Sequence, residues 1–253
     1  MDKAIIERNF SRCARFYDRY ADIQRLAAER LIGLAPDAGF KEILEIGCGT
    51  GNYTIMLREK FRTAHIKAIE ISEEMVGIAR LKTGTAGVEF VIADAEKIDL
   101  SAGFDLVTSN ASFQWFENME SSIKRYKEIL SAGGVILFSS FGPLTFLELG
   151  RVLKDVAGGQ MVDSSAFQDK DALTGLLKRH FRGAAVEELT VKETYPSLRD
   201  LLGKIKYTGT RGSGLGNALL WRKGMFEKVE ETYKNIFGAI EATYQLFFCK
   251  GIK

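Results

Sequence analysis

Residues 42–51 read Glu-Ile-Leu-Glu-Ile-Gly-Cys-Gly-Thr-Gly, an apolar strand pattern that runs directly into three glycines at alternate positions. An amphipathic run over residues 52–60 follows and predicts a helix. A strand, a glycine-rich turn and a helix in this order form the ligand-binding corner of an open α/β sheet. Gly47, Gly49 and Gly51 permit a tight turn and let a ligand lie against the bare backbone, because no Cβ fills that space.

Short apolar runs and amphipathic helices continue to alternate along the chain, which is the pattern of a doubly wound, mostly parallel α/β sheet. Two later runs, 186–194 and 242–249, are predicted to pair antiparallel and to complete seven strands. The other predicted strands are 66–71, 88–93, 104–109 and 134–141, and the predicted helices are 73–82, 119–130, 145–156, 169–181, 198–205 and 221–237.

We expect a single domain over residues 1–253. A helix over Ala4–Leu34 is predicted to form an N-terminal cover of about residues 1–35. Helical insertions at about residues 142–182 and 196–238 are expected to form a lid over the substrate.

Composition excludes several classes of protein. Lys and Arg number 35 against 33 acidic residues, so the net charge of +2 gives no general attraction for nucleic acid. The cysteines, Cys13, Cys48 and Cys249, lack metal-ligand spacing, which favours a reducing cytoplasm without disulfides or zinc. Charged residues interrupt the first helix, so we expect no membrane span. The histidines, His65 and His180, are expected at the surface rather than in catalysis.

Polar side chains stand at the carboxyl ends of four predicted strands. Glu45 would repel a pyrophosphate but can engage an ammonium group, and Glu70, 19 residues after Gly51, can accept hydrogen bonds from both hydroxyls of a ribose. Asp94 can accept from the exocyclic amine of an adenine, and Asn110 ends the fourth strand. Any one of these acids could be a helix cap or a surface residue. A nicotinamide oxidoreductase accounts for the glycines and Glu70 but not for the whole set.

With this set of residues, the chain resembles the class I S-adenosylmethionine-dependent methyltransferases over about residues 40–141. The resemblance implies S-adenosylmethionine as the cofactor. The cofactor-binding residues that it implies in the sheet region are Glu45, Gly47, Cys48, Gly49, Gly51, Glu70, Ile71, Met75, Asp94, Ala95 and Asn110.

Flanking motifs resemble a narrower family, the malonyl-acyl-carrier-protein O-methyltransferases of biotin synthesis. The similar stretches are residues 9–24, the Ser-Asn-x-x-x-Gln-Trp run at 109–115, and residues 139–149, 201–210 and 242–244. The resemblance implies methyl transfer to the free carboxylate of malonyl-acyl carrier protein or of the corresponding CoA thioester. Ser140 and Gly150 depart from the family pattern, which leaves the substrate contacts open.

The same resemblance implies roles for residues outside the glycine motif. Tyr17 and Gln24 become lid contacts to the cofactor, and Gln114 and Trp115 become candidates for positioning the reactants. We expect Phe10 and Phe16 simply to pack.

Substrate contacts are predicted from the residues around the expected lid. Lys206, Thr208, Arg211 and Trp115 are the candidates, although the two cations could equally be solvated loop residues. The stretches 204–206 and 222–223, with Arg211, could also dock an acidic carrier protein.

A malonyl carboxylate is ionised near neutral pH, so its methylation needs alignment rather than a general base. The absence of a catalytic dyad from the motifs fits this reaction. Two alternatives stay open. One is a carboxyl methyltransferase for a free small acid such as an aconitate-like substrate, and the other is a noncatalytic S-adenosylmethionine-binding protein.

Overall fold

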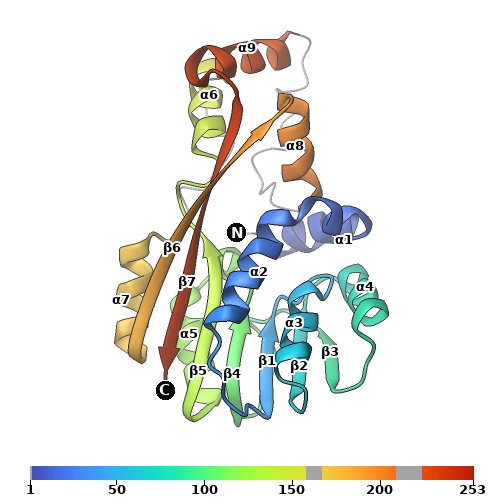
Figure 1. Ribbon diagram of the computed structural model, residues 1–253, viewed down its shortest axis with the longest axis vertical. Coiled ribbons are helices and arrows are strands. Elements are labelled where there is room, and N and C mark those ends of the chain that lie inside the picture. Colours follow the sequence, from blue (N-terminus) through green and yellow to red (C-terminus); the bar gives the residue numbers. More distant parts are fainter. Residues whose placement is uncertain (1, 158–166, 209–223) are drawn as a thin grey trace.

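The computed structural model describes residues 2–157, 167–208 and 224–253, and its centre is one seven-stranded sheet (Figure 1). The strand order is β3-β2-β1-β4-β5-β7-β6. Neighbours from β3 to β5 pair parallel, and β7 pairs antiparallel with both β5 and β6. This confirms the predicted sheet, including the pairing of Val186 with Cys249. The strands are β1 Glu42–Ile46, β2 His65–Glu70, β3 Val88–Ile92, β4 Phe104–Ser109, β5 Leu130–Phe141, β6 Arg182–Tyr195 and β7 Ile240–Ile252.

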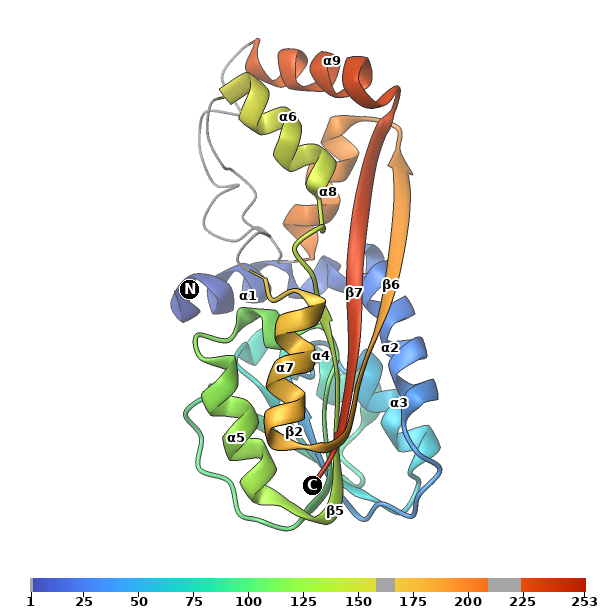
Figure 2. The ribbon, with the colours of Figure 1, turned by 90° about the vertical axis from the view of Figure 1, so that its left-hand side faces the viewer.

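Helices cover both faces of the sheet (Figure 2). One face carries α2 (Asp22–Leu34), α3 (Asn52–Lys60) and α4 (Glu73–Thr83), and the other carries α5 (Met119–Ile129) and α7 (Lys170–His180). The strands are therefore apolar on both sides: in β1, Ile43 packs into one core while Leu44 and Ile46 pack into the other. No helix in the described part of the chain is long and apolar enough to cross a membrane.

The N-terminal cover differs from the single helix expected over Ala4–Leu34. The structure divides it into α1 (Lys3–Tyr20) and α2, which meet at Ala21 with φ −91° and ψ 37°. Neither glycine nor proline marks the break. The two helices pack on different neighbours, α1 on α4 and α8 and α2 on α3, so tertiary packing explains the bend where local sequence does not.

Strands β6 and β7 extend beyond the sheet as a two-stranded ribbon that carries a helical cap (Figures 1 and 2). Pairing of β5 with β7 ends at Phe141 and Leu246, whereas β6 and β7 stay paired as far as Tyr195 and Ile240. The cap contains α6 (Leu147–Ala157), α8 (Leu198–Tyr207) and α9 (Met225–Phe237). Helix α7 instead packs beside α5 on the sheet, so only the α6 part of the expected 142–182 insertion belongs to the cap.

The chain leaves the sheet for the cap through residues 142–149, one of the stretches similar to the methyltransferase family. The Gly142 N–H donates to the Gln245 carbonyl at 2.9 Å, and a Cβ at Gly142 would lie 2.4 Å from the Phe247 ring. Glu148 is buried in α6, where its carboxylate accepts from the Thr243 N–H at 2.9 Å and from the Thr243 hydroxyl at 2.5 Å. This motif therefore fastens the cap to β7.

Replacing Glu148 by Ala is expected to lower the free energy of unfolding by about 2–3 kcal/mol, because it leaves two buried donors of Thr243 without an acceptor. Urea-induced unfolding would measure the change. Glu128→Ala, at an exposed position of α5, is the matched control and should change stability by less than about 0.5 kcal/mol. Equal effects of the two substitutions would contradict this role of Glu148.

Candidate functional site

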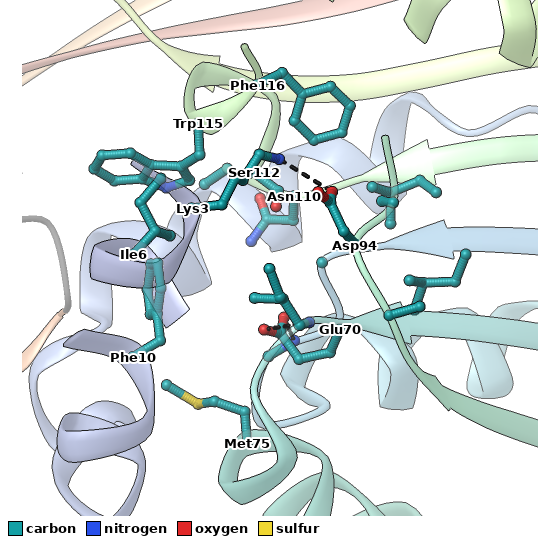
Figure 3. A pocket seen from close by; sticks show the side chains of 18 of the residues that line it. Lys3, Ile6, Phe10, Glu70, Met75, Asp94, Asn110, Ser112, Trp115 and Phe116 are labelled. Carbon is teal, nitrogen blue, oxygen red and sulfur yellow. Dashed lines mark hydrogen bonds and ion pairs between the residues drawn. The ribbon is translucent and has the colours of Figure 1, made fainter. Parts of the chain in front are cut away.

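The main pocket lies at the carboxyl ends of the central strands, beneath α1, with a volume of ≈ 700 Å³ that includes space continuous with solvent. Figure 3 shows Lys3, Ile6 and Phe10 of α1 across this pocket from Glu70 and Asp94. A second pocket of ≈ 350 Å³ adjoins it, and both are lined by Tyr17, Gly47, Gly49 and Asn110, so they form two ends of one crevice. The second end also contains Gln24, Arg25, Cys48, Thr50, Asn52 and Tyr53.

The glycine loop between β1 and α3 forms the floor of the crevice. Gly47 and Gly49 have φ values of +67° and +53°, which favour glycine. A Cβ on Gly47 would lie 2.1 Å from the Ser112 hydroxyl oxygen, whereas a Cβ on Gly49 would meet no protein atom within 4 Å. Gly47 is therefore needed for packing between two loops, and Gly49 leaves room for a ligand.

Four N–H groups of this loop are engaged within the protein. Gly47 and Cys48 donate to the Ile69 carbonyl at 2.8 and 3.1 Å, and Gly49 donates to Glu70 Oε2 at 3.1 Å. Gly51 donates to the Cys48 carbonyl at 2.9 Å. Loops that bind phosphates present free N–H groups to the ligand. These four do not, so Gly47, Cys48, Gly49 and Gly51 offer a phosphate no backbone donor.

Glu70 is held rigidly at the end of β2. Its Oε1 accepts from the N–H groups of Ile71 and Ser72 at 2.9 and 3.0 Å, while Oε2 accepts from Gly49. Burial raises the pKa of this carboxyl, and the three backbone hydrogen bonds oppose that rise. Glu70 lines the pocket and keeps acceptor capacity, since two carboxylate oxygens offer about four acceptor sites.

Asp94 lines the same pocket beyond β3, where Lys3 of α1 reaches it. Lys3 Nζ lies 3.2 Å from Asp94 Oδ1 and 2.6 Å from Glu96 Oε2, and 4.9 Å from the centre of the Phe116 ring. Burial acts to raise the pKa of Asp94, but the hydrogen bond from the Glu96 N–H and the Lys3 charge outweigh it and hold that pKa below its usual value. Asp94 therefore stays ionised beside the pocket, as an acceptor for a ligand amine.

Glu45 occupies a different position from the one expected. Its carboxyl is 1% exposed and lines neither end of the crevice, and Oε2 has no hydrogen-bond partner among the described residues. Burial, with a smaller contribution from the Glu70 charge, raises its pKa from 4.5 to about 8. Glu45 is therefore a buried, protonated carboxyl at neutral pH and does not contact the crevice directly.

Helix α1 is fastened over the crevice at three points. Lys3 holds its first turn to Asp94, and the Ser11 hydroxyl lies 2.9 Å from that of Ser72 in its middle. Near its last turn, Asp18 accepts from Thr50 at 2.6 Å, Asn52 at 2.9 Å and Lys82 at 2.8 Å. The cover is thus tied to the same loops that line the crevice.

Aromatic residues form the apolar part of the crevice wall. Phe10 lines the pocket and meets Trp115 edge to face with ring centres 6.1 Å apart, so the expectation that it merely packs was wrong. Phe16 does pack, on Tyr207 with ring centres 5.4 Å apart, although its side chain is 51% exposed. Tyr17 is partly buried where the two ends of the crevice meet, and desolvation of its hydroxyl raises the pKa of that group.

The remaining predicted cofactor residues line one end of the crevice or the other, with the exception of Gly51. Ile71, Met75 and Ala95 line the main pocket, and Gln24 and Cys48 line the smaller end. Gly51 lines neither, because it packs against α4, where a Cβ would lie 3.1 Å from that of Ala79. The buried Gln24 Oε1 has no partner among the described residues, which leaves an acceptor for a ligand donor.

Two polar residues of the 109–115 stretch shape the crevice from within the protein. Asn110 Nδ2 donates to the Gln24 carbonyl at 2.9 Å, and its Oδ1 accepts from the Ser139 hydroxyl at 2.7 Å. Gln114 Nε2 donates to the Ala111 carbonyl at 2.6 Å, and Gln114 does not line the crevice. Gln114 thus supports the loop that presents Trp115 to the pocket.

The predicted substrate residues are not brought together. Trp115 lines the main pocket, but Lys206 is exposed, and the Thr208 hydroxyl donates to the Lys204 carbonyl at 2.9 Å within α8. Arg211 lies outside the described residues. The buried cation of α8 is Lys204, which lies 2.6 Å from Asp22 Oδ1 and also contacts Glu193.

Sequence reasoning missed Lys3, Asp18 and Ser112. Helical spacing could have found Lys3, since it lies on one face of α1 with Ile6, Phe10 and Tyr17. No local pattern marks Ser112, because its importance comes from its contact with Gly47 in the loop after another strand.

Comparison with known proteins gives both a fold and a family. Residues 44–138 match the methyltransferase domain family. The chain is 34% identical to malonyl-[acyl-carrier protein] O-methyltransferase 2 of Ilyobacter polytropus, over 98% of this chain and 97% of the relative. It is 32% identical to the malonyl-[acyl-carrier protein] O-methyltransferase of Acetivibrio thermocellus, over 98% of this chain and 93% of the relative.

Solved structures share the fold at low identity. The YcgJ protein of Bacillus subtilis superposes with a TM-score of 0.63 at 14% identity, covering 90% of this chain and 98% of that one. Phosphoethanolamine N-methyltransferase 2 of Haemonchus contortus, solved with S-adenosyl-L-methionine, gives 0.59 at 17% identity, covering 94% and 56%.

The position of Glu45 predicts a pH-dependent stability. Between pH 4.5 and 8 the folded protein keeps a proton that the unfolded chain releases, so this carboxyl makes stability fall as pH rises through that window, by up to about 1.4 kcal/mol per pH unit. Glu45→Gln should remove this contribution, so its stability relative to the wild type should increase with pH.

Urea unfolding of both proteins at several pH values between 4.5 and 8 would measure the difference. Glu59→Gln, an exposed position on α3, is the control and should follow the wild type. A constant difference between Glu45→Gln and the wild type across the window would contradict the burial of an uncompensated carboxyl.

Proposed function

The chain belongs to the malonyl-[acyl-carrier protein] O-methyltransferase family, and from this premise we propose that it transfers a methyl group from S-adenosylmethionine to the free carboxylate of malonyl-acyl carrier protein. The product is the malonyl methyl ester and the second product is S-adenosylhomocysteine. We propose that this reaction serves biotin synthesis in the cytoplasm.

The observation that carries the proposal is the composition of the crevice. Acidic residues lie where the strands end, and four N–H groups of the glycine loop donate to acceptors within the protein. Glu70 matches the paired hydroxyls of a ribose, and Asp94 matches an adenine amine. A dinucleotide would place a diphosphate over Gly47 and Gly49, where the N–H groups donate to Ile69 and Glu70 instead. The chemistry of the crevice thus fits an adenosyl amino acid.

The smaller end of the crevice fits the amino-acid part of the cofactor. Gln24 offers a buried Oε1 with no partner among the described residues, and the buried Glu45 carboxyl is close enough to Cys48 and Tyr53 of this end to raise their pKa. An ammonium group nearby would favour the ionised form of Glu45, which the apolar surroundings otherwise disfavour.

When bound, the cofactor supplies an activated methyl group on a sulfonium. The residues of this chain then need to align the acceptor and exclude water, since proximity and desolvation are what an ionised carboxylate requires. Phe10, Trp115 and Phe116 provide apolar walls, and α1 closes over them. Neither histidine lines the crevice, in agreement with a reaction that needs no general base.

The activity can be tested with methyl-labelled S-adenosylmethionine and malonyl-acyl carrier protein. We expect the label to appear on the carrier protein as a base-labile methyl ester. Free small acids, including an aconitate-like acid, should be methylated at less than about one hundredth of the kcat/KM for the carrier-protein substrate. Cofactor binding without transfer to any acid would refute the proposal in favour of a noncatalytic protein, and preference for a free acid would refute the carrier-protein substrate.

Because Lys3 helps to hold α1 over the crevice, we predict that Lys3 slows the dissociation of bound S-adenosylhomocysteine. Lys3→Met removes the cation between Asp94 and Glu96, so the first turn of α1 should open more readily. The dissociation rate of S-adenosylhomocysteine should rise about threefold to tenfold, equivalent to about 1 kcal/mol. Stopped-flow fluorescence of Trp115 would measure it. Arg8→Met, on the outer face of the same helix, is the control, and an equal increase there would contradict the role of Lys3.

A further inference from the structure

The outer face of α1 carries four exposed arginines, Arg8, Arg12, Arg15 and Arg19. Their spacing of four, three and four residues places them within about 60° of one another around the helix axis. The opposite face of α1 holds Ile6, Phe10 and Tyr17 against the crevice. We call these four residues the arginine stripe. One helix therefore covers the pocket with one side and presents a row of positive charge with the other.

The arginine stripe has no acidic partner within 4.0 Å among the described residues. Asp18, the acid nearest its end, is occupied by Thr50, Asn52 and Lys82. Like charges four residues apart destabilise a helix by about 0.2–0.5 kcal/mol per pair. The stripe thus costs the isolated helix stability. Since the whole chain has a net charge of only +2, the stripe is a local concentration of charge.

The cap extends this surface at one side. Phe16, next to Arg15, is 51% exposed and its ring lies 5.4 Å from that of Tyr207 in α8. The exposed Lys206 adjoins them, since its carbonyl accepts from Cys13 Sγ at 2.9 Å. An exposed aromatic ring beside several cations is typical of a protein-binding surface.

Lys204 does not belong to this surface, although it was expected to help dock a partner. It is 7% exposed, and Asp22 and Glu193 neutralise its charge inside the protein. Arg211, Arg222 and Lys223 lie outside the described residues. The available positive surface is therefore on α1 rather than along α8.

We propose that the arginine stripe is the surface on which the acidic acyl carrier protein docks. This inference rests on the proposed function, because the malonyl group then arrives on a flexible thioester arm attached to an acidic protein. Docking on the outer side of α1 brings that arm to the edge of the crevice, since a helix is only about 10 Å across. Arginine suits this role because its guanidinium pairs with carboxylates through two hydrogen bonds.

The test is a double charge reversal, Arg12→Glu with Arg15→Glu, compared with Arg62→Glu. Arg62 is exposed and precedes β2, at the end of the sheet opposite the crevice. Each protein is assayed with malonyl-acyl carrier protein and with the malonyl thioester of pantetheine, which has the arm without the protein. Binding of S-adenosylhomocysteine by calorimetry shows that each variant is folded.

We expect the double variant to raise KM for malonyl-acyl carrier protein about tenfold or more, with kcat unchanged. Its kcat/KM for the pantetheine thioester should stay within about twofold of the wild type, and its activity on the carrier protein should depend less on salt. Arg62→Glu should match the wild type on both substrates.

Two outcomes would overturn the docking surface while leaving the activity intact. One is an unchanged KM for the carrier protein in the double variant, and the other is an equal loss on both thioesters, which would place the stripe in catalysis or folding. Failure of the wild type to methylate either thioester would instead overturn the proposed function, so the two failures are distinguishable.

Discussion

The site depends on one set of hydrogen bonds, those by which the glycine loop turns its N–H groups back toward β2. Gly47 and Cys48 donate to Ile69, and Gly49 donates to the carboxylate of Glu70. These bonds fix the loop, orient Glu70 and occupy the N–H groups of Gly47, Cys48 and Gly49. In the proposed function this loop faces an adenosyl amino acid rather than a dinucleotide.

Helix α1 connects the remaining parts of the site. Its inner face closes the crevice through Phe10 and Tyr17, and its ends are fastened by Lys3 and Asp18 to loops that line the same crevice. Contacts that hold the cover closed and contacts that shape the cofactor site therefore share residues. Closure of α1 and the geometry of the site are consequently linked, and a partner that binds the outer face of α1 would act on both.

Sequence predicted the sheet well because buried parallel strands need apolar residues on both sides, and such runs are conspicuous. Glu70 and Asp94 line one pocket, as expected for strand ends of a parallel sheet that meet at one edge, and their contacts to a cofactor stay a prediction. Glu45 was harder to place: the sequence puts it at that edge but does not show that its side chain is buried away from the crevice. Residues at the end of β1 alternate between faces, and which face a ligand occupies depends on the three-dimensional turn.

Other features could not be predicted because they arise from contacts distant in sequence. The bend at Ala21 has no local signal, and the choice between Lys204 and Lys206 as the buried cation depends on Asp22 and Glu193, which lie on other elements. The same is true of Ser112 against Gly47. In each case the deciding partner is brought in by the fold.

The β6–β7 ribbon has a consequence for how such a protein can diversify. The segment that carries α8 and α9 leaves the ribbon at the end of β6 and returns to it at the start of β7, and the antiparallel register of the ribbon is set by its own pairing. The segment that carries α6 leaves the sheet at the end of β5. Lengthening or exchanging those segments leaves the strand order and the nucleoside-facing edge unaltered. The cap can thus change in length and sequence while the sheet beneath it stays the same.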